Sequence, residues 1–197
     1  FIVGDPEAIL VVEYYGESQD ELAQKMDNLD AILKERDLGY ASVRATTATE
    51  QANVWGVRKN GLGLLMGMKG DTKPATFVED TAVSPEYLPE YISRFRQIVA
   101  DHDTTATYYA HASVGTLHIR PLINLKSTED IDKMRRIAED IRDLVLEFGG
   151  AMSGEHGDGL ARSHLIPKFF GPKLNNAFRE VKRVFDPEGL MNPGKIV

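Results

Sequence analysis

The sequence predicts an α+β fold in which helices cover one face of an antiparallel sheet. Short runs of β-branched and aromatic residues, such as 8–15 and 105–111, are typical of strands. Amphipathic segments such as 128–148 predict helices, which must return across those strands to bury their apolar faces. The chain shows no internal repeat of fixed period, so we do not expect a repeat architecture.

The composition is that of a globular protein. The chain has 197 residues, 42% hydrophobic and 27% charged, which is enough for one sizeable core or two small ones. The net charge of −7 argues against nucleic acid as the main partner, because phosphate binding requires a basic surface. Without cysteine, the chain has no disulfide, thiol nucleophile or iron–sulfur ligand. No apolar run reaches the roughly 18 residues that a membrane span requires.

Strands and helices are expected to alternate in the first part of the chain. The apolar run at 8–15 predicts a buried strand. Residues 18–21 (SQDE) form a capping box, which predicts the start of a helix. A second strand is expected at 41–45 and a helix at 49–58. Glycines interrupt the pattern at 59–74, where we expect either a loop that closes over a ligand or a plain linker.

The next segments predict a strand, a helix and a pair of strands. We expect a strand at 76–80. Ser84 and Pro85 are a helix cap followed by proline at the first helical position, although Pro89 threatens the first turn. Two further strands are expected within 104–125, joined by a turn at Val114 and Gly115.

Two helices are expected near the end of the chain. An amphipathic helix at 128–148 ends at Gly149 and Gly150, which are suitable C-cap residues. A last helix at 172–185 is stopped by Asp186 and Pro187.

The expected pair of strands suggests a metal site. A two-residue loop at Val114 and Gly115 would place His111 directly opposite His118, with Cβ atoms roughly 4.5–5.5 Å apart. Two neutral imidazoles so placed can share a metal ion, and Glu155 is the natural third ligand. However, histidines on neighbouring strands are often only half-buried polar residues, and Val-Gly is a weaker turn signal than Asn-Gly. The pattern alone therefore leaves metal binding open.

A glycine-rich motif occupies residues 152–159 (MSGEHGDG). Three glycines in six residues weaken helices and strands but permit the backbone to approach a ligand closely. His156 lies next to Glu155, where it cannot easily reach the same metal but can act as a general base on a substrate hydroxyl. The alternative is a polar turn before a helix, in which His156 is structural and Asp158 only an N-cap. Arg120 is expected on the same face as His118, where it could bind an anionic group.

Four segments together resemble the C-terminal domain of FAD-linked oxidases and dehydrogenases, a family related to vanillyl-alcohol oxidase. The resemblance covers nearly the whole chain and identifies it with D-lactate, glycolate and D-2-hydroxyglutarate dehydrogenases. The segments are YAHASVGTLHIRP (109–121), SGEHGDG (153–159), FDP (185–187) and MNPGK (191–195).

The resemblance implies roles for individual residues. His111, His118 and Glu155 would hold a divalent metal, zinc or manganese, and His156 would take the hydroxyl proton of a D-2-hydroxy acid as hydride leaves for the flavin. Arg58 would bind the substrate carboxylate, and Asn192 would lie against the flavin ring.

The sequence departs from the family pattern between the two histidines. Many members have Gly-Asp-Gly-Asn there, where this chain has 112–116 (ASVGT). An asparagine contact to the substrate is thereby lost. Arg120 would replace it, which leaves the substrate open.

The resemblance also implies a wider organisation. Residues 1–197 would form a ferredoxin-like cap domain, in which 150–197 contacts a separate flavin domain. Because the sequence begins directly at Phe1, we expect a fragment that lacks this FAD-binding domain and is inactive alone. The expected partners are a 2-hydroxy acid and an electron acceptor, either a downstream iron–sulfur domain or a separate carrier, with self-association left open. The expected location is cytoplasmic, with peripheral attachment to the inner membrane as an alternative.

Two other functions stay open at this point. One is a free-standing metal-dependent hydrolase that uses the two histidines and one carboxylate. The other is a non-catalytic module that docks onto a partner subunit.

Overall fold

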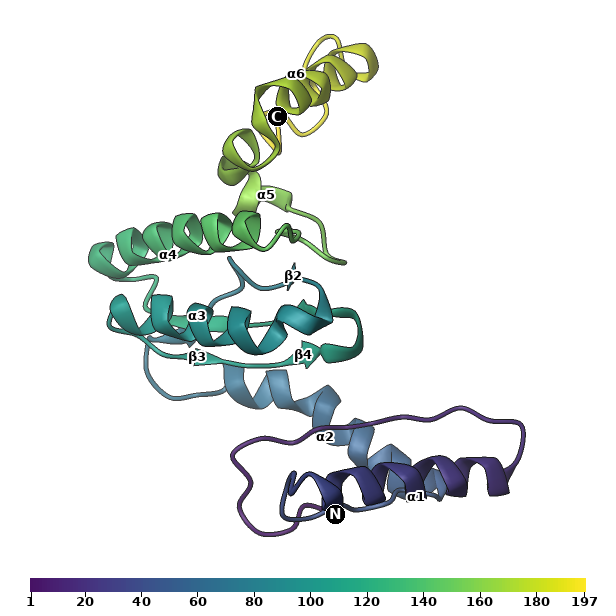
Figure 1. Cartoon of the computed structure of the whole chain (residues 1–197). Helices are drawn as coiled ribbons and strands as arrows, with labels where there is room; N and C mark the ends of the chain where they lie inside the picture. Colours follow the sequence, from purple (N-terminus) through teal and green to yellow (C-terminus); the bar gives the residue numbers. More distant parts are fainter. The chain divides into compact units, whose positions relative to one another are not determined.

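The computed structural model describes the backbone of residues 1–197 and every side chain except that of Leu62. The chain divides into two compact units, residues 1–64 and 65–197. The described residues contain helices and short antiparallel strands (Figure 1), which confirms the predicted α+β class.

The regular structure of the first unit is helical. Helix α1 spans Gln19–Glu35, and the Ser18 hydroxyl accepts the backbone N–H of Glu21, as the capping box predicts. Helix α2 spans Ala48–Met66 and therefore runs past the end of the unit. Arg44, in the segment between the helices, forms ion pairs with Asp27 and Asp30 on α1.

Two predicted strands of this unit are wrong. Residues 8–15 and 41–45 have no strand structure, and Ile9, Leu10 and Val11 are exposed. A strand requires a hydrogen-bonded neighbour, and the described residues of 1–64 include no other strand that could pair with either run. Apolar residues of high β propensity show that a segment suits a sheet, but they do not supply its partner.

The predicted loop at 59–74 is helical over its first half. Each glycine in a helix costs about 1 kcal/mol relative to alanine, a cost that adjacent helix formers can outweigh. Residues 48–66 contain no proline, so the hydrogen-bond ladder of α2 can continue through Gly61 and Gly63. The backbone leaves the helix only after Met66, and Gly70 has a left-handed φ of 94°.

The second unit contains two small antiparallel sheets. One has the strand order β1-β6-β3 and the other β2-β5-β4. Their strands are β1 Lys73–Pro74, β2 Thr81–Ala82, β3 Ala106–Thr107, β4 Ala110–His111, β5 Thr116–Leu117 and β6 Arg120–Ile123.

The predicted strand at 76–80 is also wrong, because these residues form bends and a turn. Asp80 has a left-handed φ of 73°, which breaks the extended backbone. Phe77 and Val78 enter the core, and Glu79 and Asp80 are buried beside them. The segment thus buries four consecutive side chains, which a strand with alternating faces does not do when only one face is covered.

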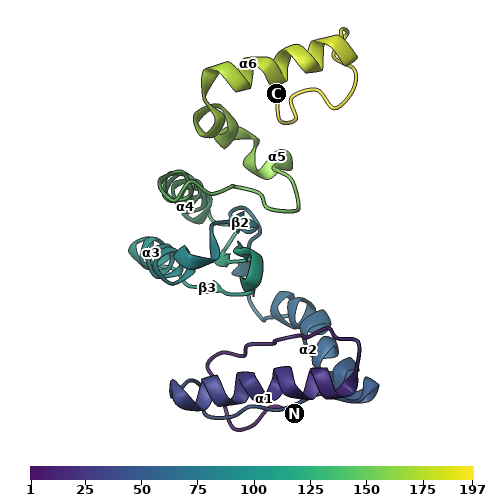
Figure 2. The same cartoon turned by 45° about the vertical axis from the view of Figure 1, so that its right-hand side comes forward.

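Two long helices cover the strands on one side (Figure 2). A short 3-10 turn, η1 (Pro85–Tyr87), precedes α3 (Leu88–Asp101), so proline displaces the helix start as expected. Helix α4 spans Thr128–Glu147 and agrees with the predicted helix at 128–148. The core between helices and strands includes Tyr91, Phe95, Val99, Leu117, Ile119, Ile123, Ile137, Ile141, Leu144 and Val145.

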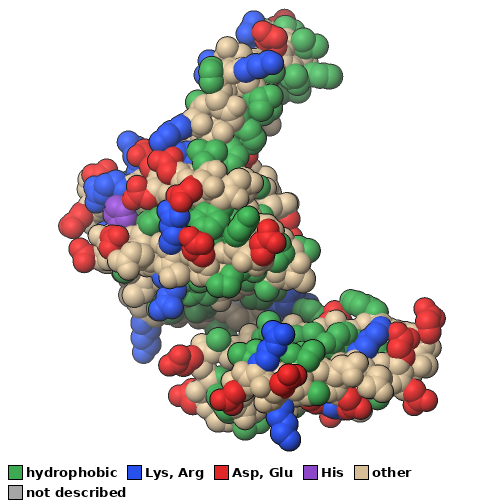
Figure 3. Space-filling view, in the orientation of Figure 1, with side chains coloured by type: hydrophobic (Ala, Val, Ile, Leu, Met, Phe, Trp, Pro, Cys, Tyr) green, Lys and Arg blue, Asp and Glu red, His purple; other side chains and the backbone are tan. Residues whose placement is uncertain are grey.

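The chain ends in a short helix, a turn and a kinked helix. These are α5 (Gly159–Arg162), η3 (Ser163–Leu165) and α6 (Ile166–Phe185). Gly171, with a φ of 75°, kinks α6 just before the predicted start at residue 172. Apolar side chains are exposed along the last helix and after it (Figure 3), among them Val181, Val184, Phe185 and Leu190. Within the described chain, no helix is both long and apolar enough to cross a membrane.

Candidate metal centre

The first part of the candidate site is the hairpin that carries two histidines. The structure pairs His111 with Thr116, and the His118 backbone N–H donates to the carbonyl of Tyr109 at 2.7 Å. The predicted direct pairing of His111 with His118 is therefore wrong, because the loop contains four residues, 112–115. The register differs by two residues, so both histidines remain on one face as diagonal neighbours. Their ring centroids lie 5.1 Å apart.

Gly115 explains why the loop takes this form. It ends the 3-10 turn η2 (Ala112–Val114) with a left-handed φ of 76°. A Cβ atom at this position would lie 1.8 Å from the carbonyl oxygen of Val83. The Val83 N–H donates to the Gly115 carbonyl at 3.1 Å, so the loop packs directly against the next segment. Only glycine allows both the backbone conformation and this close approach.

The second part of the site is the motif at 153–156, which wraps around the buried side chain of Asp80. The Asp80 carboxylate accepts the Ser153 hydroxyl at 2.6 Å, the His156 backbone N–H at 2.8 Å and the Glu155 N–H at 3.1 Å. Burial tends to raise the pKa of Asp80, but these hydrogen bonds hold the pKa below its ordinary value. An ionised Asp80 thus fixes the backbone from which Glu155 and His156 project.

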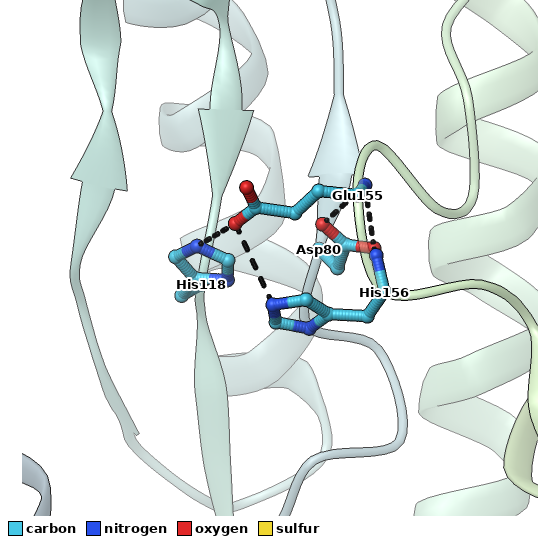
Figure 4. Close-up of side chains that lie close together, drawn as sticks. All are labelled: Asp80, His118, Glu155 and His156. Atoms are coloured by element: carbon cyan, nitrogen blue, oxygen red, sulfur yellow. Dashed lines mark hydrogen bonds and ion pairs between the residues drawn. The ribbon is translucent and has the colours of Figure 1, made fainter.

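Three imidazoles converge on one oxygen of Glu155. Its Oε1 atom lies 3.0 Å from His118 Nε2 and 3.5 Å from Nε2 of both His111 and His156. Figure 4 shows one oxygen of the Glu155 carboxylate joined by dashed lines to the rings of His118 and His156, and the Asp80 carboxylate joined to the backbone of Glu155 and His156. His156 thus comes closer to the candidate metal ligands than its place next to Glu155 in the sequence led us to expect.

These donors fit a divalent metal ion. Ligands about 2.0–2.1 Å from a tetrahedral metal lie about 3.3 Å from one another, close to the separations around Glu155 Oε1. Burial lowers the pKa of His118, with the carboxylates of Glu79 and Glu155 opposing it, and the neutral ring is the form that binds metals. Asp80, His118, Glu155 and His156 each offer one ligand atom within 4.8 Å of the others. Because the Asp80 carboxylate already accepts three hydrogen bonds, we regard Asp80 as a support for the ligands.

A second buried carboxylate, Glu79, lies behind the imidazoles. Its Oε1 atom is 2.9 Å from His156 Nδ1, and its Oε2 atom is 2.7 Å from Arg120 Nη2 and 3.6 Å from His118 Nδ1. From the sequence, Glu79 and Asp80 were expected in a strand, within a looser part of the family resemblance, and neither was expected in the site. A Glu-Asp pair within an apolar segment, where charged side chains are rarely fully buried without partners, is the signal that could have revealed them.

Comparison with known proteins agrees with this geometry. Residues 3–196 match the family described as FAD linked oxidases, C-terminal domain. The chain belongs to this family. It is 35% identical over 193 residues, or 94% of its length, to D-2-hydroxyglutarate dehydrogenase of Haemophilus influenzae. It is 28% identical over 98% of its length to D-lactate dehydrogenase of Archaeoglobus fulgidus, and 25% over 96% to glycolate oxidase subunit GlcD of Bacillus subtilis.

The chain spans only part of these members of the FAD-linked oxidase family. It covers 18% of the length of the Haemophilus influenzae protein, 40% of the Archaeoglobus fulgidus protein and 39% of the Bacillus subtilis protein. The match therefore identifies the family domain that the chain represents.

Three further residues, Arg58, Asn192 and Arg120, were expected in the site from the sequence. Arg58 belongs to the first unit, where its guanidinium lies over the Trp55 ring, 5.4 Å from the centroid. Asn192 is exposed in the C-terminal loop with a left-handed φ of 47°. Arg120 reaches the cluster from β6, but its guanidinium faces the Glu79 carboxylate.

Proposed function

We propose that the chain is the substrate-binding and proton-accepting half of a flavin-dependent dehydrogenase that oxidises a D-2-hydroxy acid to the 2-oxo acid. The observation that carries the proposal is the convergence of three imidazole Nε2 atoms on Glu155 Oε1. Family membership supports it, because the relatives are named for D-2-hydroxyglutarate, D-lactate and glycolate, which are all 2-hydroxy acids.

In this proposal His111, His118 and Glu155 hold a divalent cation, zinc or manganese. Two neutral imidazoles and one carboxylate leave coordination positions for a substrate. When bound, the cation would supply a Lewis acid for the hydroxyl and carboxylate oxygens of the hydroxy acid. The ligands come from two segments that Asp80 joins, because its backbone N–H donates to the Leu117 carbonyl and its carboxylate accepts the N–H groups of Glu155 and His156.

His156 is the proposed general base. Its Nδ1 atom faces Glu79, and its Nε2 atom faces the group around Glu155. A neutral ring that is protonated at Nδ1 has its lone pair on Nε2, where it can accept the hydroxyl proton of a substrate. The exposed fraction of the His156 side chain is 45%, so a substrate can reach this nitrogen.

The remaining parts of the reaction require groups outside the chain. FAD, held mainly by a separate flavin-binding domain, would supply the hydride acceptor. Asn192 lies exposed on a C-terminal loop that Asp186 fixes by accepting the N–H groups of Leu190 and Met191, so its amide is available for contact with such a group. Arg58 is the proposed partner of the substrate carboxylate. The same proposal includes a further electron acceptor, a cytoplasmic location and association of several copies.

Metal titration with matched histidine variants tests the centre. We expect the chain to bind one Mn²⁺ or Zn²⁺ ion, His118→Ala to lose this binding, and His102→Ala to retain it. His102 is a suitable control because it pairs with Asp140 and takes no part in the group around Glu155. Equal binding by wild type and His118→Ala would contradict the proposed ligands.

Turnover in the complete flavoprotein tests the role of His156. We expect His156→Ala to retain the metal but to lower kcat by about 100- to 10,000-fold, which is the usual contribution of a general base. Hydrolytic activity of the chain in the absence of flavin would instead favour a metal-dependent hydrolase. Normal oxidation of 2-hydroxy acids by His156→Ala would contradict the proposed base.

A further inference from the structure

We propose that Glu79 is the positioning residue for two imidazoles at once: it orients the base His156 and the metal ligand His118, and Arg120 is its counter-ion. This inference rests on the proposed function. It assigns a role to a buried carboxylate that neither binds the metal directly nor touches the reacting atoms.

Both the side chain and the backbone of Glu79 are held by arginine residues. Its side chain is 8% exposed, and the Arg120 guanidinium lies 2.7 Å from Oε2 as an ion pair. Its backbone carbonyl accepts a hydrogen bond of 2.7 Å from Arg162, whose second amino group donates to the Gly157 carbonyl at 2.6 Å. Arg162 thus ties the backbone of Glu79 to the motif that carries His156. A buried carboxylate with a fixed backbone and a paired charge is well placed to impose orientation on its neighbours.

The contact with His156 determines which ring nitrogen carries the proton. An ionised carboxylate is only an acceptor, so an imidazole nitrogen 2.9 Å from Glu79 Oε1 must be the donor. His156 is therefore protonated at Nδ1, and in the neutral ring the lone pair lies on Nε2. Nε2 is the atom that faces Glu155 Oε1, at 3.5 Å. Glu79 thus turns the basic nitrogen of His156 toward the substrate side of the site.

Glu79 contacts His118 in the same way, with Nδ1 of the ring toward Glu79 and Nε2 toward Glu155. Nδ1 of His118 lies 3.6 Å from Glu79 Oε2, and Nε2 lies 3.0 Å from Glu155 Oε1. Among the described residues, His118 Nδ1 and Glu79 Oε2 are both buried without an aligned hydrogen bond, although each has the capacity for one. A hydrogen bond from Nδ1 to Glu79 would fix the tautomer in which Nε2 binds a metal, as outer carboxylates commonly do for histidine ligands.

Arg120 takes a different role in this arrangement from the one expected from sequence. Its side chain is 12% exposed, and it faces the carboxylate that needs a positive partner. A guanidinium that neutralises Glu79 permits an ionised carboxylate to remain buried beside two imidazoles.

The tautomer of His156 is measured directly by 15N NMR on the histidine-labelled 197-residue chain at alkaline pH, with His156→Asn used to assign the signals. We expect a protonated Nδ1 and an unprotonated Nε2 in the wild-type chain. Titration with Mn²⁺ or Zn²⁺ then compares wild type, Glu79→Gln and the matched control Glu147→Gln, whose carboxylate pairs with Arg94 on the surface. We expect Glu79→Gln to weaken metal binding roughly 10- to 100-fold and Glu147→Gln to leave it unchanged.

Each outcome decides a separate part of the inference. A wild-type His156 protonated at Nε2 would overturn the role of Glu79 toward the base, even if Glu79→Gln did not fold. Equal metal affinity in wild type and Glu79→Gln would overturn its role toward His118. If the wild type binds no divalent metal but His156 carries its proton on Nδ1, the proposed metal centre fails and the pairing of Glu79 with His156 is supported.

Discussion

The Asp80 carboxylate accepts the backbone N–H of His156 at 2.8 Å, across 76 positions of sequence. This bond joins the turn before β2 to the glycine-rich motif, and further bonds from Ser153 and Glu155 reinforce it. The two segments approach closely at Gly154, whose N–H donates to the Asp80 carbonyl at 2.7 Å. One buried anion therefore sets the position of both a candidate metal ligand and a candidate base.

Replacing Asp80 should destabilise the fold and loosen the motif together. In Asp80→Asn the neutral amide cannot accept all three hydrogen bonds as an ionised carboxylate does, so we expect a loss of about 1.5–3 kcal/mol in the free energy of unfolding. Urea denaturation measures the loss, and metal titration should show weaker binding in the same variant. Asp132→Asn, an exposed change on α4, serves as the control. An Asp80→Asn variant as stable as this control would argue against the account.

Two glycines with similar backbone conformations allow a matched test of the hairpin. Gly115 and Gly149 both have left-handed φ, at 76° and 62°, but an added Cβ meets the Val83 carbonyl oxygen only at Gly115. We expect Gly149→Ala to cost about 1–2 kcal/mol for its backbone conformation. Gly115→Ala should cost a further 1–3 kcal/mol or so because the loop must move away from Val83. Thermal or urea unfolding compares the two, and equal costs would show that the close approach is absent in solution.

Removal of Arg120 should leave a buried charge without its partner. For Arg120→Met we expect a loss of about 3–5 kcal/mol in the free energy of unfolding, because the buried Glu79 then lacks its cationic partner. The double variant Glu79→Met, Arg120→Met should recover part of that loss. Arg94→Met, which breaks an exposed pair with Glu147, should have a far smaller effect. If Arg120 served only to bind substrate, Arg120→Met would be as stable as wild type.

The C-terminal loop should open at low pH. The hydrogen bond from Lys182, together with the N–H groups of Leu190 and Met191, holds the pKa of Asp186 below its ordinary value of 3.8. A lowered pKa stabilises the folded loop at pH values above 3.8, and the stabilisation is lost as the pH falls through the lower folded value. Amide exchange at Leu190 and Met191, relative to the intrinsic rate, should therefore rise in this acidic range. The rise should be absent in Asp186→Asn, and its persistence there would assign it to another group.

Much of the helical structure could be predicted because its signals are local. The Ser18 cap, the proline at 85 and the apolar stripe of α4 each determine a helix within a few residues. The predicted strands at 8–15 and 41–45 had only local signals, whereas a strand forms only with a partner elsewhere in the chain. The residue pattern therefore indicated β propensity but did not identify a pairing strand.

The candidate site was predictable to the extent that its residues lie in glycine-rich or histidine-bearing motifs. His111 and His118 were expected to lie together, and they do, although the loop between them has four residues because Gly115 takes a left-handed conformation after a 3-10 turn. Glu79 and Asp80 were missed as site residues because their partners lie far away in sequence, on β6, in the residues just before it and in the glycine-rich motif. Nothing in the local pattern of residues 76–80 indicates that distance.

X-ray absorption spectroscopy of the zinc-loaded chain distinguishes the proposed metal ligands His111, His118 and Glu155 from the proposed base His156. We expect a single zinc ion with two imidazole ligands and a carboxylate. His111→Ala should lower the number of imidazole ligands from two to one, and His156→Ala should leave it at two. Zinc that loses an imidazole in His156→Ala but not in His111→Ala would show that His156 is a ligand and would contradict its role as the base.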